Sequence, residues 1–117
     1  MHELSIVQSV VTSVTEWLAG QPPGRIKTVT LRVGALSGVV EDALQFGYEI
    51  ATTGTPLSGS TLEVRRQPVV IYCQPCADLA ELPGVQSFRC PRCDTPSGDI
   101  RHGRELEIES LEIEEDE

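Results

Sequence analysis

Two stretches, Cys73-Gln74-Pro75-Cys76 and Cys90-Pro91-Arg92-Cys93, decide how the C-terminal half of this chain folds. Thirteen residues separate the second cysteine from the third. Two C-x-x-C motifs at this distance can place four thiolates around one ion, and that is the tetrahedral environment of structural Zn(II). The sequence therefore predicts a closed, structural zinc site with four ligands: Cys73, Cys76, Cys90 and Cys93.

The same four cysteines allow other interpretations. They could form two disulfides, stay four unrelated thiols, or supply one C-x-x-C to a thiol oxidoreductase. A redox pair needs only one such motif beside a βαβ pattern, so the duplication favours a metal. If the protein binds zinc and has no titratable free thiols, a thiol oxidoreductase function is disfavoured. The intervening segment, Ala77–Arg89, is expected to have little core of its own.

Composition and charge narrow the choice of compartment and partners. The 117 residues suit one domain, or one domain with a small satellite. No run of eighteen apolar residues is present, and residues 1–20 lack the basic lead of a signal or transit peptide. We therefore expect no membrane association and a cytoplasmic location, where thiols stay reduced and bind metal more often than they pair.

The net charge of −9 lies almost entirely in one segment, because residues 105–117 contain eight acids and no base. Such a surface repels phosphate backbones, so no nucleic-acid partner is expected. A zinc ribbon that binds nucleic acid or a transcription complex is still the main alternative function. Its basic candidates are Arg89, Arg92, Arg101 and Arg104, and four acids in the same module offset them: Asp78, Glu81, Asp94 and Asp99.

The N-terminal part alternates between helix and strand patterns. An apolar stripe at steps of three and four predicts a first helix, with Leu4, Val7, Val11, Val14 and Leu18 inward. Strict alternation over Lys27–Val33 predicts a strand, with Val29, Leu31 and Val33 on its buried face. A second helix is expected from about Glu41 to Thr52, with acids in its first turn.

Two further strands complete the expected fold. One begins at Thr61 and resumes after Pro68 as Val69–Tyr72, and the other covers Glu105–Glu114. The order predicts an α+β fold, in which two helices pack on a three-stranded sheet and a four-cysteine zinc-ribbon module is inserted. We expect an α+β domain formed by residues 1–72 plus 104–117 and a module formed by residues 73–103.

The start of the chain, Met1-His2-Glu3, offers a second kind of metal site. The Met1 α-amine, the His2 backbone nitrogen and the His2 imidazole can close adjacent chelate rings around one ion. Nitrogen ligands in a plane suit Cu(II) or Ni(II). Three nitrogens leave one position open, which suits an ion that is handed on. The other histidine, His102, is expected to be a solvated residue of the turn Gly98–Gly103.

Together, several motifs resemble the HypA/HybF family of hydrogenase nickel-incorporation proteins. The residues that carry the resemblance are Met1–Val7, Arg32–Val39, the two C-x-x-C motifs and Gly103–Leu106. The resemblance implies a nickel metallochaperone, with transferable Ni(II) as cargo and structural Zn(II). No nucleophile, base and orienter occur in a recognisable arrangement, so no catalytic site is expected. The resemblance also implies a hydrogenase-maturation GTPase and the large subunit of [NiFe]-hydrogenase as partners, and some members serve urease maturation. A second copy of the chain, in a homodimer, is a further partner considered.

Carried over by position, the resemblance makes His2 the essential nickel ligand and Glu3 a neighbour that coordinates or tunes the ion. The Met1 amine is a further donor. Some relatives have an acidic residue just after the first strand, where this chain has Val40. Glu41, the next residue, is the candidate substitute, and the fourth nickel ligand stays open. The resemblance also matches the four cysteines to zinc ligands.

Overall fold

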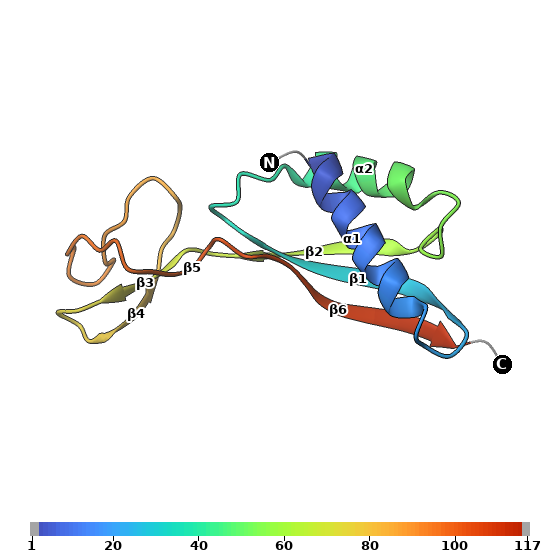
Figure 1. The fold of residues 1–117 in the computed structure, drawn as a ribbon. Helices are drawn as coiled ribbons and strands as arrows, with labels where there is room; N and C mark the ends of the chain where they lie inside the picture. The colour runs from blue at the N-terminus through green and yellow to red at the C-terminus, as the bar shows by residue number, and fades with distance from the viewer. Residues whose placement is uncertain (1–2, 116–117) are drawn as a thin grey trace. The chain divides into compact units, whose positions relative to one another are not determined.

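A computed structural model describes residues 3–115, and over this range the chain forms two helices and six strands. In chain order these are α1 (Glu3–Leu18), β1 (Gly24–Gly34), α2 (Glu41–Thr52), β2 (Thr61–Gln67), β3 (Val70–Cys73), β4 (Asp78–Glu81), β5 (Ile100–His102) and β6 (Leu106–Glu115). The strands form two three-stranded sheets, ordered β2-β1-β6 and β4-β3-β5 (Figure 1). The predicted α+β class is confirmed.

The chain divides into two compact units. Unit 1 comprises the residues up to Leu31, Val39–Val64 and the residues from Ile108 onward. Unit 2 comprises Arg32–Gly38 and Arg65–Glu107, and so includes the four cysteines. The domain boundaries expected from sequence, at residues 72/73 and 103/104, stay a prediction.

Unit 1 is built from two helices and the strands beneath them. Within it, α1 and α2 pack together and lie on the same face of the strands (Figure 1). The alternation predicted for β1 is confirmed: Val29 is 0% exposed and Leu31 2%, while Thr28 and Thr30 on the other face are partly exposed. Neither helix of the described chain is long and apolar enough to span a bilayer.

The buried face of α1 differs from the predicted stripe. Its buried residues are Ile6, Val7, Val10 and Val14. Leu4 is 48% exposed, and Val11 and Leu18 are only partly buried. Ile6-Val7 and Val10-Val11 stand as adjacent apolar pairs in the first three turns, so more than one stripe of similar quality was available. The packing of α2 against α1 decides which of these stripes is buried, and this packing cannot be read from the sequence of α1 alone.

The second predicted strand is divided at Pro68 into β2 and β3. Proline has no N–H to donate to a ladder, so a strand that changes sheets can do so there. β3 pairs antiparallel with β4, from Val70 opposite Glu81 to Cys73 opposite Asp78. β4 and β5 were not predicted.

The segment Ala77–Arg89 contributes two buried residues, Ala80 and Leu82, to a core that it shares with the rest of unit 2. A buried cluster in unit 2 joins residues in or next to β3 and β4 to Cys90: Val69, Ile71, Cys73, Ala80, Leu82 and Cys90. Leu36, Phe88 and Ile100 are partly buried against it. The module therefore has a small apolar core next to the cysteine cluster.

His102 is exposed, as predicted, but it ends β5 and does not lie in a turn. Its Nδ1 lies 2.8 Å from Oε2 of Glu105. The other carboxylate oxygen of Glu105 accepts a hydrogen bond from the Gly103 N–H at 2.7 Å. The Glu105 side chain is thus held from two sides at the start of β6.

Two glycines allow two segments of unit 2, residues 34–36 and 103–105, to approach closely. The Gly34 N–H donates to the Glu105 carbonyl at 2.7 Å, and the Leu36 N–H donates to the Gly103 carbonyl at 2.7 Å. A Cβ on Gly34 would stand 2.1 Å from the Gly103 carbonyl oxygen. Gly103 itself has φ +128, a conformation that L side chains rarely adopt. Both positions therefore require glycine.

Gly34→Ala is expected to lower the free energy of unfolding by about 3 kcal/mol, the upper end of the usual cost of overpacking, because the added methyl group meets backbone. Urea denaturation measures it. Gly98→Ala is the matched control: it has open space around its Cβ position and an ordinary φ, so its effect should stay within about 0.5 kcal/mol. Equal stability of the two variants would contradict the close approach.

Candidate metal centre

The four cysteine sulfurs converge at one point in unit 2. All four Sγ atoms lie within 4.8 Å of one another. Cys73 Sγ is 3.5 Å from Cys93 Sγ, and Cys76 Sγ is 3.9 Å from Cys90 Sγ. These distances are far above a disulfide bond of about 2.05 Å. They are close to the edge of about 3.8 Å in a tetrahedron with Zn–S bonds of about 2.3 Å. The donor set therefore fits one tetrahedral, thiophilic dication.

The first pair of cysteines belongs to the β3–β4 hairpin. Cys73 is the last residue of β3, and Cys76 stands in the turn before β4 begins at Asp78. The Ala77 N–H closes this turn by donating to the Gln74 carbonyl at 3.0 Å. Ala77 has φ 51, in the left-handed region. The hairpin register thus fixes the spacing of the first two ligands.

The second pair stands on a loop with a similar turn. The Asp94 N–H donates to the Cys90 carbonyl at 2.7 Å, and Asp94 has φ 62. The Cys90 N–H in turn donates to the Thr95 carbonyl at 2.9 Å. Each C-x-x-C motif is therefore followed by one left-handed residue, which reverses the chain. Sequence reasoning missed this feature, because neither residue is glycine.

Hydrogen bonds divide the four thiols into two kinds. Backbone N–H groups of Arg92 and Cys93 lower the pKa of Cys90 to about 6. The Thr95 hydroxyl, 3.2 Å from the sulfur, lowers the pKa of Cys93. Hydrogen bonds with the thiols of Cys93 and Cys73 raise the pKa of Cys76 to about 12. Four thiolates this close repel one another, so a cation is required for all four to be ionised together.

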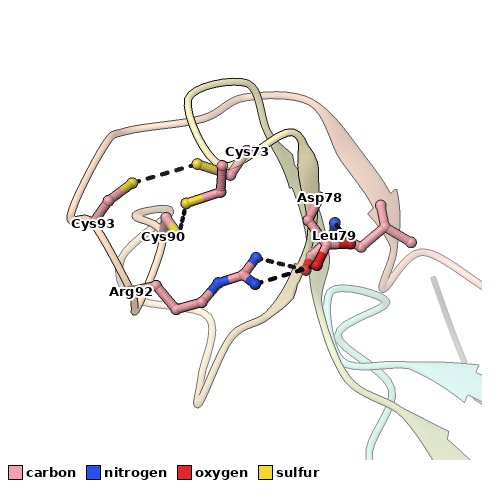
Figure 2. A network of polar contacts seen from close by, with 7 residues as sticks. Cys73, Asp78, Leu79, Cys90, Arg92 and Cys93 are labelled. Atoms are coloured by element: carbon pink, nitrogen blue, oxygen red, sulfur yellow. Dashed lines mark hydrogen bonds and ion pairs between the residues drawn. The ribbon is translucent and has the colours of Figure 1, made fainter.

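Arg92 links the second motif to the strand after the first. Its guanidinium donates to a carboxylate oxygen of Asp78 at 3.2 Å and to the Leu79 carbonyl at 2.9 Å (Figure 2). The hydrogen bond with Asp78, and after it one with the Cys90 sulfur, raises the pKa of Arg92. One positive charge thus lies beside a sulfur cluster that keeps a net negative charge even around a dication.

The arginines of this module are mostly paired with acids. The guanidinium of Arg101 contacts both carboxylate oxygens of Asp99, at 2.8 and 3.0 Å, and lies 4.9 Å from the centre of the Tyr72 ring. Arg89 lies 3.9 Å from Asp94. These ion pairs reduce the positive potential that a nucleic-acid ribbon would need.

Of the predicted nickel-binding residues, only Glu3 and Glu41 fall within the described part of the chain. Met1 and His2 lie outside the described residues. Glu3 is in the first turn of α1, and Glu41 is in the first turn of α2, both partly buried in unit 1. Within the described part of the chain, the four cysteines form the one group of three or more potential metal ligands.

Comparison with known proteins points to one family. A family model described as hydrogenase/urease nickel incorporation, metallochaperone, hypA, matches residues 1–113. The hydrogenase maturation factor HypA of Chloroflexus aurantiacus is 50% identical over 112 residues, covering 96% of this chain and 98% of the relative. That of Roseiflexus sp. is 45% identical over 116 residues, covering 99% and 94%.

The fold also matches solved structures. The solution structure of the Ni metallochaperone HypA from Helicobacter pylori superimposes with a TM-score of 0.67 at 20% identity, covering 99% of this chain and all of that one. A second, described as the solution structure of HypA protein, gives a TM-score of 0.71 at 20% identity. At this identity the likeness shows the fold.

Removal of the metal by a strong chelator is expected to unfold unit 2 locally. Zinc binding by such sites contributes on the order of 10–16 kcal/mol, comparable with the stability of a whole domain. Hydrogen exchange should show that β3 and β4 amides lose protection, whereas Val29 and Leu31 in unit 1 keep theirs. Unchanged protection of β3 and β4 after demonstrated metal loss would contradict this dependence.

Ala77→Gly is expected to stabilise the metal-loaded protein by up to about 1 kcal/mol. An L residue in the left-handed region costs roughly 1–2 kcal/mol, and the flexibility of glycine in the unfolded chain offsets about half of that. Chemical denaturation measures the change. Ala80→Gly, at a buried strand position, should have the opposite sign. A loss of stability in both variants would mean that Ala77 is not strained.

Proposed function

Because this chain belongs to the HypA family of hydrogenase and urease nickel-incorporation metallochaperones, we propose that it binds Ni(II) at Met1-His2-Glu3 and delivers it to a [NiFe]-hydrogenase during maturation. The recipient is the hydrogenase large subunit, and a nickel-handling GTPase of the maturation machinery assists. Delivery to urease is a second route, supported by the description of the family. The chain acts as a carrier and not as an enzyme.

The metal of the four-cysteine centre is, in this proposal, Zn(II) with a structural role. Four thiolates complete a tetrahedral shell and leave no position for water or substrate. The proposal that structural and cargo metals bind at different sites rests on this closed donor set. It uses every cysteine of the chain and leaves no open coordination position for a cargo ion. The cargo must therefore bind elsewhere, and His2 is the imidazole that the family motif supplies.

The nickel site is proposed to use the His2 imidazole and backbone nitrogen, with Glu3 as a ligand or neighbour. In a chain that starts at Met1, the α-amine adds a third nitrogen. Glu41 is the proposed acid for the remaining position. A dication near the start of α1 meets the positive end of the helix dipole, which opposes binding by some tenths of a kcal/mol to about 1. The charge of Glu3, in the first turn, offsets that cost.

The remaining features of the proposal follow from these two ions. A nickel-binding domain of residues 1–72 plus 104–117 would carry the cargo, and a module of residues 73–103 would carry the zinc. Homodimer formation is a further expectation. Four unpaired cysteines suit the cytoplasm, where thiols stay reduced.

His2→Ala is expected to lower nickel affinity by more than about a hundredfold, since the loss of a ligand exceeds the 10–100-fold effect of outer-shell partners. Affinity of the untagged wild type should also fall as pH drops from about 8 to about 6. Over that window the amine and the imidazole take up protons, and the protonated forms cannot bind metal. Isothermal titration with Ni(II) measures both effects.

The matched control is His102→Ala, which removes the other histidine of the chain and should leave nickel affinity unchanged. Residues added before Met1 should weaken binding about as much as loss of His2, because they remove the amine and its chelate ring. Affinity that is constant with pH, or equal in the two histidine variants, would reject the proposed ligands.

A further inference from the structure

The outer face of α2 exposes large apolar side chains. Phe46 is 68% exposed and Ile50 56%, and they stand one turn apart, so their side chains are neighbours. Leu44 and Tyr48, on the opposite face of the helix, are buried. Gly47 is also buried, and it borders the exposed face because it stands three residues before Ile50. The chain has only two phenylalanines, and one of them, Phe46, is exposed and adds nothing to the small hydrophobic core.

A third exposed apolar residue joins this face from the start of α1. Leu4 is 48% exposed, and its Cδ1 lies 3.7 Å from the place where a Cβ of Gly47 would stand. The missing side chain at Gly47 thus lets Leu4 lie against α2. Figure 1 shows the beginning of α1 beside α2. Leu4 directly follows His2-Glu3 in the chain, so the apolar face begins next to the proposed nickel ligands.

The two helices that form this face carry acidic side chains and no basic ones. Asp42 and Glu49 stand on the same exposed side of α2 as Phe46. α1 contains two acidic residues and α2 three, and neither helix contains lysine or arginine. An apolar centre with an acidic rim is complementary to an apolar pocket with a basic rim.

We propose that Leu4, Phe46 and Ile50, called here the α2 face, dock into an apolar pocket rimmed by lysine and arginine on a partner protein of the nickel pathway. This proposal rests on the proposed function and adds to it the surface that meets the partner. Phe46 supplies the buried anchor, since aromatic side chains in desolvated pockets carry much of the energy of an interface. Asp42 and Glu49 steer the approach and fix the orientation.

Other occupants fit the charges less well. A second copy of this chain would bring the same acidic residues face to face across a two-fold axis, and like charges there oppose association. An anionic membrane surface would repel them as well. A basic-rimmed protein surface satisfies both the apolar and the acidic parts of the face.

The test uses two purified probes: the hydrogenase-maturation GTPase and the nickel-free precursor of the [NiFe]-hydrogenase large subunit, both from the source organism. Their Kd values are measured by interferometry with wild type, Phe46→Ser and Ile50→Ser, at two salt concentrations. Trp17→Ser is the matched control, because Trp17 is 43% exposed on α1 and stands outside this face. Asp42→Lys with Glu49→Lys is compared with Glu16→Lys, which changes an exposed acid near the other end of α1.

The expected result is at least a tenfold loss of affinity for one probe in Phe46→Ser and Ile50→Ser, with wild-type affinity in Trp17→Ser. Asp42→Lys with Glu49→Lys should slow association several-fold more than Glu16→Lys. All variants should keep wild-type nickel affinity, since none is a proposed ligand. Loss of nickel binding in the wild type would reject the proposed function instead, independently of this surface.

Three outcomes would overturn the proposal. Equal affinities of Phe46→Ser and Trp17→Ser for the probe that binds would show that docking uses another surface. Conversion of a wild-type dimer to a monomer by Phe46→Ser, seen in light scattering, would assign the face to a second copy. Absence of wild-type binding to both probes would exclude the partner class named here.

Discussion

The architecture of unit 2 depends on one electrostatic constraint: four sulfurs within 4.8 Å of one another cannot all carry a negative charge without a cation between them. The raised pKa of Cys76 reflects its hydrogen bonds with the thiols of Cys93 and Cys73, whereas backbone N–H groups of Arg92 and Cys93 lower the pKa of Cys90. A dication offsets the repulsion among the sulfurs and ties the β3–β4 hairpin to the second cysteine turn. The small core around Ile71 and Leu82 is then closed by metal bonds.

This constraint also explains the surroundings of the cluster. A dication with four thiolates keeps two negative charges, and hydrogen bonds to the sulfurs spread them. The Thr95 hydroxyl and the backbone N–H groups of Arg92 and Cys93 serve this purpose, and the Arg92 side chain adds a positive charge. Such partners increase the stability of a filled site and reduce its reactivity, as suits an ion that stays.

Sequence periodicity anticipated the elements whose pattern is long and strict. The alternation of β1 and the limits of α2 are of this kind, and the spacing of the cysteines anticipated their convergence. β4 and β5 were not predicted from the sequence because strands of four and three residues are too short to show a periodic pattern. Only their pairing with β3 defines them. The requirement for glycine at Gly34 likewise comes from a segment about seventy residues later in the chain, which no local pattern contains.

The proposed nickel site differs from the closed four-cysteine site in how firmly it holds its ion, and this difference sets a requirement for nickel transfer. An ion held by an incomplete set of protein ligands near the positive end of a helix is bound weakly. A weakly bound ion is lost to solvent unless its acceptor is close. Docking supplies that closeness, since it turns transfer into an intramolecular step with an effective concentration in the millimolar range. An apolar face that begins at Leu4, directly after His2-Glu3, lies where such docking is most useful. The exposure of Phe46 removes an aromatic residue from the small core. Its use in docking to the acceptor of the metal ion explains why the side chain is exposed.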